Sequence, residues 1–455
     1  MLTFLRFLGF LVFLAVAAVV ILILWPLDRT GPAEIALAPD AMAWPDVPDA
    51  DQPRLATLAA DCSACHTADG GAPFAGGRAF PTPFGTVYSS NITPDPETGI
   101  GGYSLDEFRA ALVDGIRQDG AHLYPAMPYA SYRKMAERDV EAVYAFLKNE
   151  VPRVRAERRQ AEMTFPFNLR FGIRAWKWLA MPRPGFVPPK DPVLARGAYL
   201  VEGPEHCGAC HTPRNPLFIE RGYTAADPLF LAGGALNDWP APSLRGDAGA
   251  PARWSADNLR DYLRDGRNDH NAVAGEMSLV VAHSLQYLPD SDLDAIVAYL
   301  RAIAPNGGGR GDARPLADLT AERLWAAAGA GGTAALLAAA DPARLDLGAR
   351  LYLDNCSACH LIDGRGAPRV FPELDGNPIV NADATGGLLQ LILHGEQMPT
   401  TAGAPMRLAM PGFAGRLDDA EIAALVTFLR GAWSNAAGPV SAEAVAAARA
   451  TADAD

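Results

Sequence analysis

The stretch Cys62-Ser-Ala-Cys65-His66 has two further copies in the chain, Cys207-Gly-Ala-Cys210-His211 and Cys356-Ser-Ala-Cys359-His360. Together they use all 6 cysteines of the 455 residues. Cys-x-x-Cys-His is the attachment pattern of covalent haem c, in which two thiols form thioethers to the porphyrin and the adjacent imidazole binds the iron. The sequence therefore predicts three haem c groups. The expected attachment residues are Cys62, Cys65, Cys207, Cys210, Cys356 and Cys359, and the expected proximal iron ligands are His66, His211 and His360.

Other uses of paired cysteines fit this pattern poorly. A structural zinc site needs four ligands, and each copy offers three without a partner cluster of similar spacing. A thioredoxin-like redox motif belongs to an alternating strand and helix pattern, which the sequence lacks. Six cysteines are also too few to form a disulfide scaffold in a chain of this length. Haem attachment is the interpretation that accounts for all three copies.

Composition excludes several other classes of protein. Acidic residues number 52 and basic residues 39, which gives a formal net charge of −13. Such a chain lacks the basic surface that binds DNA or RNA, so no nucleic-acid partner is expected. Apolar residues make up 49 % of the chain and charged residues 20 %, which indicates a folded protein and excludes a disordered one.

The sequence around the motifs is also repeated. The motifs lie about a third of the chain apart, which indicates three related domains. Each motif is followed by a Gly-rich stretch, at 70–77, 231–234 and 372–376. Next comes a helix that ends at Gly115, Gly266 or Gly395, opened in the first copy by a capping box of Ser104 and Glu107. Each copy closes with an amphipathic helix, at 139–148, 291–301 and 418–430. Strand-like alternation is scarce, so the predicted class is all-α.

These patterns predict the domain boundaries. Residues 1–28 form a membrane anchor or signal, residues 151–190 and 306–340 are linkers, and the haem-binding domains span 45–150, 191–305 and 341–435. We name these three the first, second and third regions. The linker 151–190 is expected to pack against the first region, with the bilayer or a partner subunit as the alternative. The Ala-rich tail after Asn435 is expected to be a loose helix or disordered.

The N-terminus carries 19 uncharged residues, 7–25, preceded by Arg6. This length fits a single membrane-spanning helix better than the shorter apolar core of a signal peptide. The cation before it places the rest of the chain in the periplasm. A cleaved signal is the alternative, because 36–38 and 41–43 resemble cleavage sites. The expected localisation is the periplasmic side of the bacterial cytoplasmic membrane.

A six-coordinate electron carrier needs a distal ligand, and a Met opposite His raises the reduction potential. The loop between the two helices of each copy contains Met, and this recurrence outweighs the usual role of Met in filling core gaps. The expected distal ligands are Met127, Met277 and Met410. Weaker alternatives are Met135, Met398 and His283, and Met406 remains an alternative to Met410. The other histidines, His122, His206, His270 and His394, are expected to be surface or hydrogen-bonded residues.

The proximal His usually donates its second ring N–H to a backbone carbonyl, which fixes the tautomer. Pro73 and Pro372 lie in the loops where such a carbonyl could be held rigid. The second region has no Pro at the corresponding place, Leu231 to Gly234, so no acceptor is assigned there.

Several longer stretches carry a family resemblance. They are Gly-Ala-Pro-Phe-Ala-Gly-Gly77, Asn91-Ile-Thr-Pro, Leu-Tyr-Pro-Ala-Met-Pro-Tyr129, His206-Cys-Gly-Ala-Cys-His-Thr-Pro-Arg214 and Ala409-Met-Pro-Gly-Phe413. Over residues 50 to 435 the chain resembles the triheme cytochrome c subunit of bacterial periplasmic membrane-bound dehydrogenases that oxidise alcohol, gluconate, sorbitol or aldehyde. The resemblance implies class I cytochrome c domains and supports Met127, Met277 and Met410 as axial ligands.

The resemblance also implies the function. The chain would pass electrons from a large catalytic subunit, dependent on a quinone, flavin or molybdenum cofactor, to ubiquinone or a terminal oxidase at the cytoplasmic membrane. It would itself be an electron-transfer subunit, without catalytic residues. A stand-alone tethered shuttle to a terminal oxidase is the alternative, and a multihaem peroxidase is a further one.

One departure from the pattern concerns the first region. The second and third copies keep a Gly and an aromatic before the motif, Gly197 with Tyr199 and Gly348 with Tyr352. The first copy has Leu55 and Thr57 instead. This difference puts the close packing of its two terminal helices in doubt, though not haem binding.

Overall fold

The computed structural model describes residues 2–24, 48, 50–181, 186–236, 238–246, 249–303 and 345–452. The predicted linker 306–340 and the candidate cleavage sites 36–38 and 41–43 lie outside the described residues. The chain divides into two compact units, one of Met1–Pro189 with Val201–His206 and the other of Lys190–Leu200 with Cys207–Asp455. The first region falls in unit 1, and the second and third regions fall almost wholly in unit 2.

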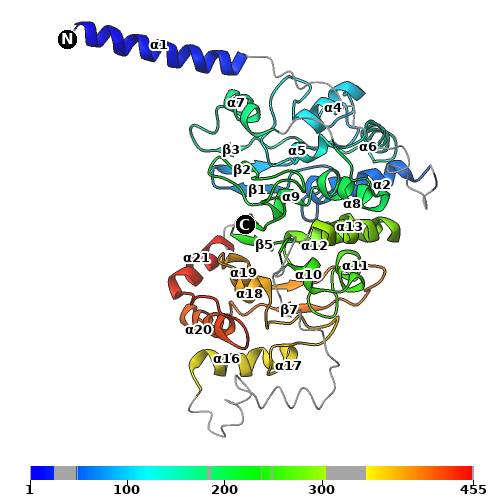
Figure 1. The fold of residues 1–455 in the computed structure, drawn as a ribbon, viewed down its shortest axis with the longest axis vertical. Coiled ribbons are helices and arrows are strands. Elements are labelled where there is room, and N and C mark those ends of the chain that lie inside the picture. The colour runs from blue at the N-terminus through cyan, green and yellow to red at the C-terminus, as the bar shows by residue number, and fades with distance from the viewer. Residues whose placement is uncertain are drawn as a thin grey trace. The chain divides into compact units, whose positions relative to one another are not determined.

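Unit 1 combines helices with one small sheet (Figure 1). The strands β1 (Ala79–Thr82), β2 (Gly85–Tyr88) and β3 (Glu162–Met163) form an antiparallel sheet in that order. The helices are α1 (Leu2–Leu24), α2 (Gln52–Ala59), α3 (Cys62–His66), α4 (Leu105–Asp114), α5 (Tyr129–Tyr132), α6 (Glu137–Asn149) and α7 (Phe171–Ala180). The capping box predicted for α4 is present, and Gly115 ends the helix in the left-handed conformation.

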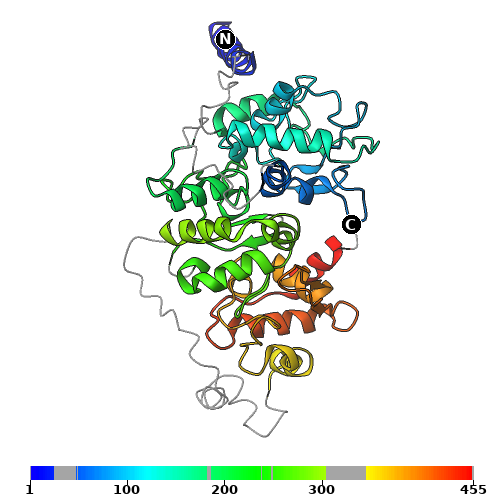
Figure 2. The same ribbon diagram turned by 90° about the vertical axis from the view of Figure 1, so that its right-hand side faces the viewer.

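Unit 2 contains the remaining elements, which both views show (Figure 1, Figure 2). Its helices are α8 (Pro192–Glu202), α9 (Gly208–His211), α10 (Ala250–Arg253), α11 (Ala256–Asp265), α12 (Glu276–His283), η2 (Leu285–Tyr287), α13 (Asp290–Ile303), α16 (Leu347–Asn355), α17 (Ser357–His360), α18 (Pro378–Asn381), α19 (Gly386–His394), α20 (Asp419–Gly431) and α21 (Ala442–Ala452). The division between the units falls near the end of α8. Its strands form two antiparallel pairs, β4 (Gly234–Leu236) with β5 (Trp239–Ala241), and β6 (Gly395–Gln397) with β7 (Ala409–Pro411).

The helix before each motif packs against the closing helix of the same region. Gly197 of α8 lies so near α13 that an added Cβ would come within 2.0 Å of the Ala295 carbonyl oxygen. Gly348 of α16 has the same relation to Ala424 of α20, at 2.4 Å. These two positions require glycine because the helix backbones touch there.

The packing doubt raised for the first region does not hold, because α2 contacts α6 without a glycine. The contact is lined by small buried side chains, Ala56 and Ala60. Thr57 satisfies its hydroxyl within the helix by donating to the Pro53 carbonyl at 2.9 Å. This crossing therefore packs with Leu55 buried at the position where the other two regions have glycine.

The prediction that the segment 151–190 packs against the first region is confirmed. Strand β3 extends the β1–β2 sheet, and Lys177 of α7 is buried with 2 % of its surface exposed. The tail helix α21 also packs, against α19 and α20, with Val445 fully buried and Arg449 paired with Asp419 at 2.9 Å. The tail is thus a docked helix and not a loose one.

The expectation of an all-α fold, with three tandem class I cytochrome c domains after an N-terminal membrane-spanning helix, is wrong. Helix makes up 46 % of the structure, and three small antiparallel sheets accompany it. Among the described helices, none has the length and apolar character that crossing a membrane requires. The compact units number two rather than three. The strands were missed because they are two to four residues long, too short to show alternation.

Candidate haem c sites

Each Cys-x-x-Cys-His copy folds as a short helical turn. In the first copy the turn is α3, which runs from Cys62 to His66, and α9 and α17 end at His211 and His360. Residues i, i+3 and i+4 share one face of a helix. The two thiols and the imidazole of a copy are therefore presented on one side. No disulfide joins any of the six cysteines, as porphyrin attachment requires.

The Nδ1 atom of each motif histidine lies against a backbone carbonyl. The distance is 2.7 Å from His66 to Ser90 O, 2.7 Å from His211 to Pro242 O and 2.9 Å from His360 to Pro372 O. A carbonyl can only accept, so Nδ1 carries the proton and donates. The bare Nε2 is left as the metal-binding atom at all three sites.

The expected acceptors are right in one region only. Pro372 is confirmed, whereas Pro73 is wrong because Ser90 supplies the carbonyl in the first region. In the second region the acceptor is Pro242, for which the sequence offered no assignment. Ser90 lies two residues after β2 and Pro242 directly follows β5. In the first two regions the hairpin after the motif thus delivers the carbonyl.

A glycine with positive φ forms a second backbone contact to each motif histidine. The backbone N–H of Gly76, Gly233 or Gly366 donates to the carbonyl of the motif histidine, at 2.8, 2.8 and 3.1 Å respectively. Their φ angles are 75°, 95° and 62°, in the left-handed region that favours glycine. The Gly-rich stretches predicted after the motifs serve this purpose. In the third region the glycine is Gly366, which precedes the predicted stretch 372–376.

Burial favours the metal-binding state of these histidines. Burial lowers the pKa of His66, His211 and His360, against the opposing effect of the carbonyl hydrogen bond. Each imidazole is therefore neutral at pH 7, the form that coordinates a metal. Burial also raises the pKa of the Cys62 thiol, and it raises that of Cys356 to about 12.

The methionines expected as distal ligands are half-buried. Met127 packs against the core that contains Cys62, and Met410 packs against the same core as Cys356. Met277 is the second residue of α12. Each of these sulfurs therefore belongs to its own motif's region.

The competing methionines are placed differently. Met406 is 62 % exposed, unlike the half-buried Met410. Met135 is a core residue with 3 % exposure. Met398 donates its backbone N–H to the Leu408 carbonyl in the loop between β6 and β7. These positions favour Met410 over Met406 as the third distal ligand.

A hydrogen bond joins the elements that carry Met277 and Met410. Ser278, next to Met277, donates its hydroxyl to Glu396 Oε1 at 3.3 Å. Glu396 is the cross-strand partner of Met410 in the β6–β7 pair. Burial raises the pKa of Glu396. The two methionine-bearing elements are therefore connected through one carboxyl group.

The other histidines have structural partners. His122 Nδ1 lies 3.1 Å from Lys177 Nζ, and burial lowers the His122 pKa to about 4. His206 is stacked edge-on against Tyr132. His270 stacks on Trp254 and lies 3.4 Å from a Glu373 oxygen. These contacts match the structural role expected from the sequence.

Lys177 was not anticipated as a support of the first site. Its Nζ donates to the carbonyls of Asp114 and Gly115, both at 2.6 Å, and lies 4.7 Å from the centre of the Tyr129 ring. Burial lowers its pKa to about 7. It thereby caps α4 and contacts both ends of the loop 115–129, which carries Met127. The sequence signal was a pair of cations, Arg174 and Lys177, within the otherwise apolar helix 171–180.

These residues fit haem c. Each region offers two cysteines outside any disulfide, an imidazole with its Nε2 available and a thioether sulfur, which is the donor set of that group. No group of three or more His, Cys, Asp or Glu side chains in the described part of the chain could hold a metal ion by itself. The cysteines and histidines thus match porphyrin attachment better than a zinc cluster.

Comparisons with known proteins agree with this chemistry. Residues 345–433 match the Cytochrome c family, so this match covers the third region and not the other two. The chain is 42 % identical over 400 residues to the cytochrome c subunit of alcohol dehydrogenase (quinone) from Gluconobacter oxydans, covering 86 % of this chain and 80 % of the relative. It is 40 % identical over 405 residues to the gluconate 2-dehydrogenase cytochrome c subunit of Pantoea cypripedii, covering 86 % and 87 %.

A third relative is the fructose dehydrogenase cytochrome subunit of Gluconobacter japonicus, 36 % identical over 428 residues, covering 89 % of this chain and 83 % of the relative. Identity at this level across most of both chains establishes common descent, and the haem-attachment chemistry is that of a c-type cytochrome. The chain belongs to the family of cytochrome c subunits of bacterial dehydrogenases, proteins that carry covalent haem c and transfer electrons.

Proposed function

We propose that the chain carries three haem c groups and passes electrons from a dehydrogenase catalytic subunit to ubiquinone or another acceptor of the respiratory chain. The observation that carries the number three is the proximal arrangement, which recurs at His66, His211 and His360 with distances of 2.7, 2.7 and 2.9 Å. The proposed distal ligands are Met127, Met277 and Met410. When bound, haem c supplies a reversible one-electron Fe(III)/Fe(II) couple.

The side chains of this chain would form no bonds with a substrate in this proposal. The cysteines attach the porphyrin, the histidine and methionine hold the iron six-coordinate, and the cores around Cys62 and Cys356 exclude water. Exclusion of water and firm ligation keep the reorganisation small and set each potential. Substrate oxidation would belong to the catalytic subunit, with its own quinone, flavin or molybdenum cofactor.

We also propose that the protein is exported and works at the periplasmic side of the bacterial cytoplasmic membrane. The support is the apolar stretch 7–25 behind Arg6, which would act as an export signal. Fractionation of the producing cells, followed by N-terminal sequencing of the mature protein, tests this. Recovery in the cytoplasmic fraction would contradict it.

The haem number is tested by mass spectrometry of protein from a host that matures c-type cytochromes. The expected mass exceeds that of the polypeptide by three haems. Three double variants, Cys62→Ala with Cys65→Ala and the two corresponding pairs, should each lose one haem. A wild-type mass with fewer than three adducts contradicts the proposal.

The partner is tested by purification from the native membrane fraction. We expect a large dehydrogenase polypeptide to co-purify, and its substrate to reduce ubiquinone only when the haem-loaded chain is present. A chain that purifies alone, and that is oxidised directly by a terminal oxidase, would favour a stand-alone shuttle. A high-spin spectrum from one third of the haem would favour a peroxidase, because such an enzyme needs an open iron position.

A further inference from the structure

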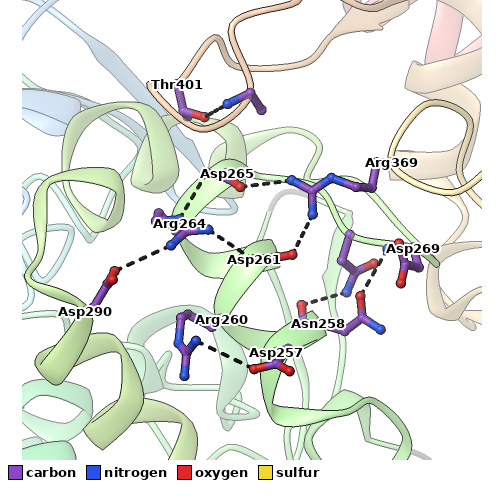
Figure 3. Close-up of polar contacts among 12 residues, drawn as sticks. Asp257, Asn258, Arg260, Asp261, Arg264, Asp265, Asp269, Asp290, Arg369 and Thr401 are labelled. Carbon is purple, nitrogen blue, oxygen red and sulfur yellow. Dashed lines mark hydrogen bonds and ion pairs between the residues drawn. The ribbon is translucent and has the colours of Figure 1, made fainter.

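The third site has an ion-paired support from a neighbouring region. Arg369 of the third region inserts its guanidinium between two carboxylates of α11 in the second region (Figure 3). Its Nη1 lies 2.5 Å from Asp261 Oδ2, and its Nη2 lies 3.0 Å from Asp265 Oδ2. Both regions belong to unit 2. The fork of an arginine can bridge two carboxylates in this way, whereas a lysine offers one point charge.

The carboxylate of Asp265 is covered by the third region. Only 1 % of its side chain is exposed. Gly403 lies so near that an added Cβ would come within 2.2 Å of Asp265 Oδ1. Arg264 also contacts this carboxylate, at 3.3 Å. A buried carboxylate needs such partners, so Arg369 is held firmly in place.

Backbone hydrogen bonds fix the same loop on both sides of Pro372. The N–H of Arg369 donates to the Asn268 carbonyl at 3.0 Å, and the N–H of Glu373 donates to the His270 carbonyl at 2.8 Å. Pro372 lies between these two anchors, and its carbonyl accepts from His360 Nδ1 at 2.9 Å. The orientation of the proximal imidazole therefore depends on how the loop is docked.

The backbone of Arg369 shows that docking constrains the loop. Its φ angle is +62°, in the left-handed region that a residue with a long side chain rarely adopts. Such a strained conformation persists where surrounding contacts enforce it. Those contacts are the ion pairs, the Asn268 hydrogen bond and the loop's own turn, in which Val370 and Phe371 donate to the Ala367 carbonyl.

We propose that Arg369 is a positioning residue for the third haem, acting through the Pro372 carbonyl on His360, so that the second region helps to set the ligation of the third iron. This inference rests on the proposed function. The first and second sites take their carbonyls, Ser90 and Pro242, from hairpins of their own regions. The second site's hairpin also touches the third region, because the Gly387 N–H donates to the Asp238 carbonyl at 3.2 Å. The loop of the third site differs in being held by ion pairs to the neighbouring region.

The expected direction follows from the hydrogen bond. A strong N–H···O=C bond makes the imidazole a better donor to iron and favours Fe(III). A loosened loop weakens that bond, so the midpoint potential of the third haem should rise. Neutralising Arg369 would also change the local charge and confuse the result. Arg369→Lys keeps the charge and removes the fork, and it is the variant of choice.

The experiment is a spectroelectrochemical titration of the purified, haem-loaded full chain. The third haem is assigned by its absence from the Cys356→Ala, Cys359→Ala double variant. In Arg369→Lys we expect one potential, that of the third haem, to rise while the other two stay unchanged. The EPR g-values of the same oxidised haem should shift, because they report the orientation of the axial ligands.

The matched control is Arg260→Lys. Arg260 lies on the same helix α11 and pairs with Asp257 and Asp294, which belong to its own region. This variant should leave the third potential and its g-values unchanged. Asp261→Glu preserves the charge and displaces one carboxylate, so it should raise the third potential by less than Arg369→Lys does. It replaces Arg369→Lys in the experiment if that variant is poorly folded.

The outcomes separate this inference from the proposed function. Wild-type protein with fewer than three haems contradicts both. Three haems with an unchanged third potential in Arg369→Lys and in Asp261→Glu overturn the positioning role alone. Faster amide exchange at Arg369 and Glu373 with unchanged potential and g-values also overturns it, because the loop would then move without affecting the imidazole.

Discussion

The first and third sites share their motif, their proximal hydrogen bond and their supporting glycine, yet they are braced by different parts of the chain. At the first site, Arg170 and Lys177 of the segment 151–190 brace the loop that carries Met127. Arg170 donates to the His122 carbonyl at 3.0 Å, and Lys177 donates to two carbonyls at the end of α4. At the third site Arg369 bridges two carboxylates of the second region.

The difference concerns which ligand each brace reaches. The first brace contacts the loop of Met127, the proposed distal ligand, and it is a buried lysine on backbone carbonyls. The third brace acts on the proximal side, where Pro372 faces His360, and it is an arginine on carboxylates. Sites with the same ligands thus have separate supports, through which their potentials can be set independently.

The largest effect should come from exchanging the distal ligands themselves. Met410→His is expected to lower one haem potential by more than about 0.08 V, because imidazole favours Fe(III). This is a tenth of the roughly 0.8 V range that axial ligands span. Met127→His should lower a different one of the three potentials. The measurement is potentiometric titration of the haem-loaded chain.

Met406→Leu is the control for this exchange. Its side chain is 62 % exposed, so all three potentials should keep their wild-type values. If Met406→Leu lowers the third potential and Met410→His does not, the assignment of the third distal ligand must be reversed.

The next largest effect should come from removing the brace of the first site. Lys177→Leu leaves the buried carbonyls of Asp114 and Gly115 without their charged donor, while the Asp114 carboxylate keeps its ion pair with Arg133. The change should cost about 3 kcal/mol of unfolding free energy. Denaturant unfolding measures this. Lys190→Leu changes an exposed lysine and should cost nothing measurable. An equal loss in both variants would show that Lys177 has no special role.

A smaller effect should come from adding a methyl group where two helices of the third region touch. Gly348→Ala puts a methyl group 2.4 Å from the Ala424 carbonyl and should cost about 2 kcal/mol of unfolding free energy. Gly431→Ala, in the same helix pair, meets nothing within 4 Å and should be neutral or slightly stabilising. Thermal unfolding of both variants measures the difference. An unchanged unfolding free energy in Gly348→Ala would contradict this, because it would mean that α16 and α20 can separate enough to accept the methyl group.

The smallest effect should be the part of the pH dependence that His122 contributes at the first brace. Burial, followed by the charges of Lys177 and Arg174, lowers the His122 pKa from 6.5 to about 4. Between these values the unfolded chain binds more protons than the folded chain, so stability should fall as the pH falls from 6.5 to 4.

His122→Gln should remove that part of the loss, as measured by denaturant unfolding at a series of pH values. The guanidinium of Arg369 keeps its charge throughout this range. Arg369→Lys should therefore leave the slope of stability against pH unchanged. Burial also lowers the pKa of His206 to about 4, so a smaller slope should remain in His122→Gln. A slope equal to that of the wild type would show that His122 contributes nothing.

The sequence predicted the local features of this protein well. The motif turns, the capping box of Ser104, the glycines that end α4 and α11, and the three closing helices are all set by residues within a few positions of one another. Met127 and Met410 are half-buried beside the cores of their own regions, and their role as distal ligands stays a prediction.

The features that the sequence did not predict depend on residues far apart in the chain. Ser90 reaches His66 across 24 residues, and Arg369 reaches Asp261 across 108. The short strands carry no alternation of their own and are specified by pairing across a turn. The arginine at 369 resembles any surface cation until the helix α11 is placed beside it.

The hydrogen bond between Ser278 and Glu396 bears on whether the third region can be used as a portable module. The Glu396 carboxyl group accepts from Ser278 of α12, and Glu396 is paired with Met410 in the β6–β7 strands. If residues 341–435 were transplanted into another carrier, that half-buried carboxyl group would face solvent or an unmatched surface, and its charge state beside the sulfur would change. A transplant intended to keep the native redox behaviour therefore has to include α12 and the loop before it.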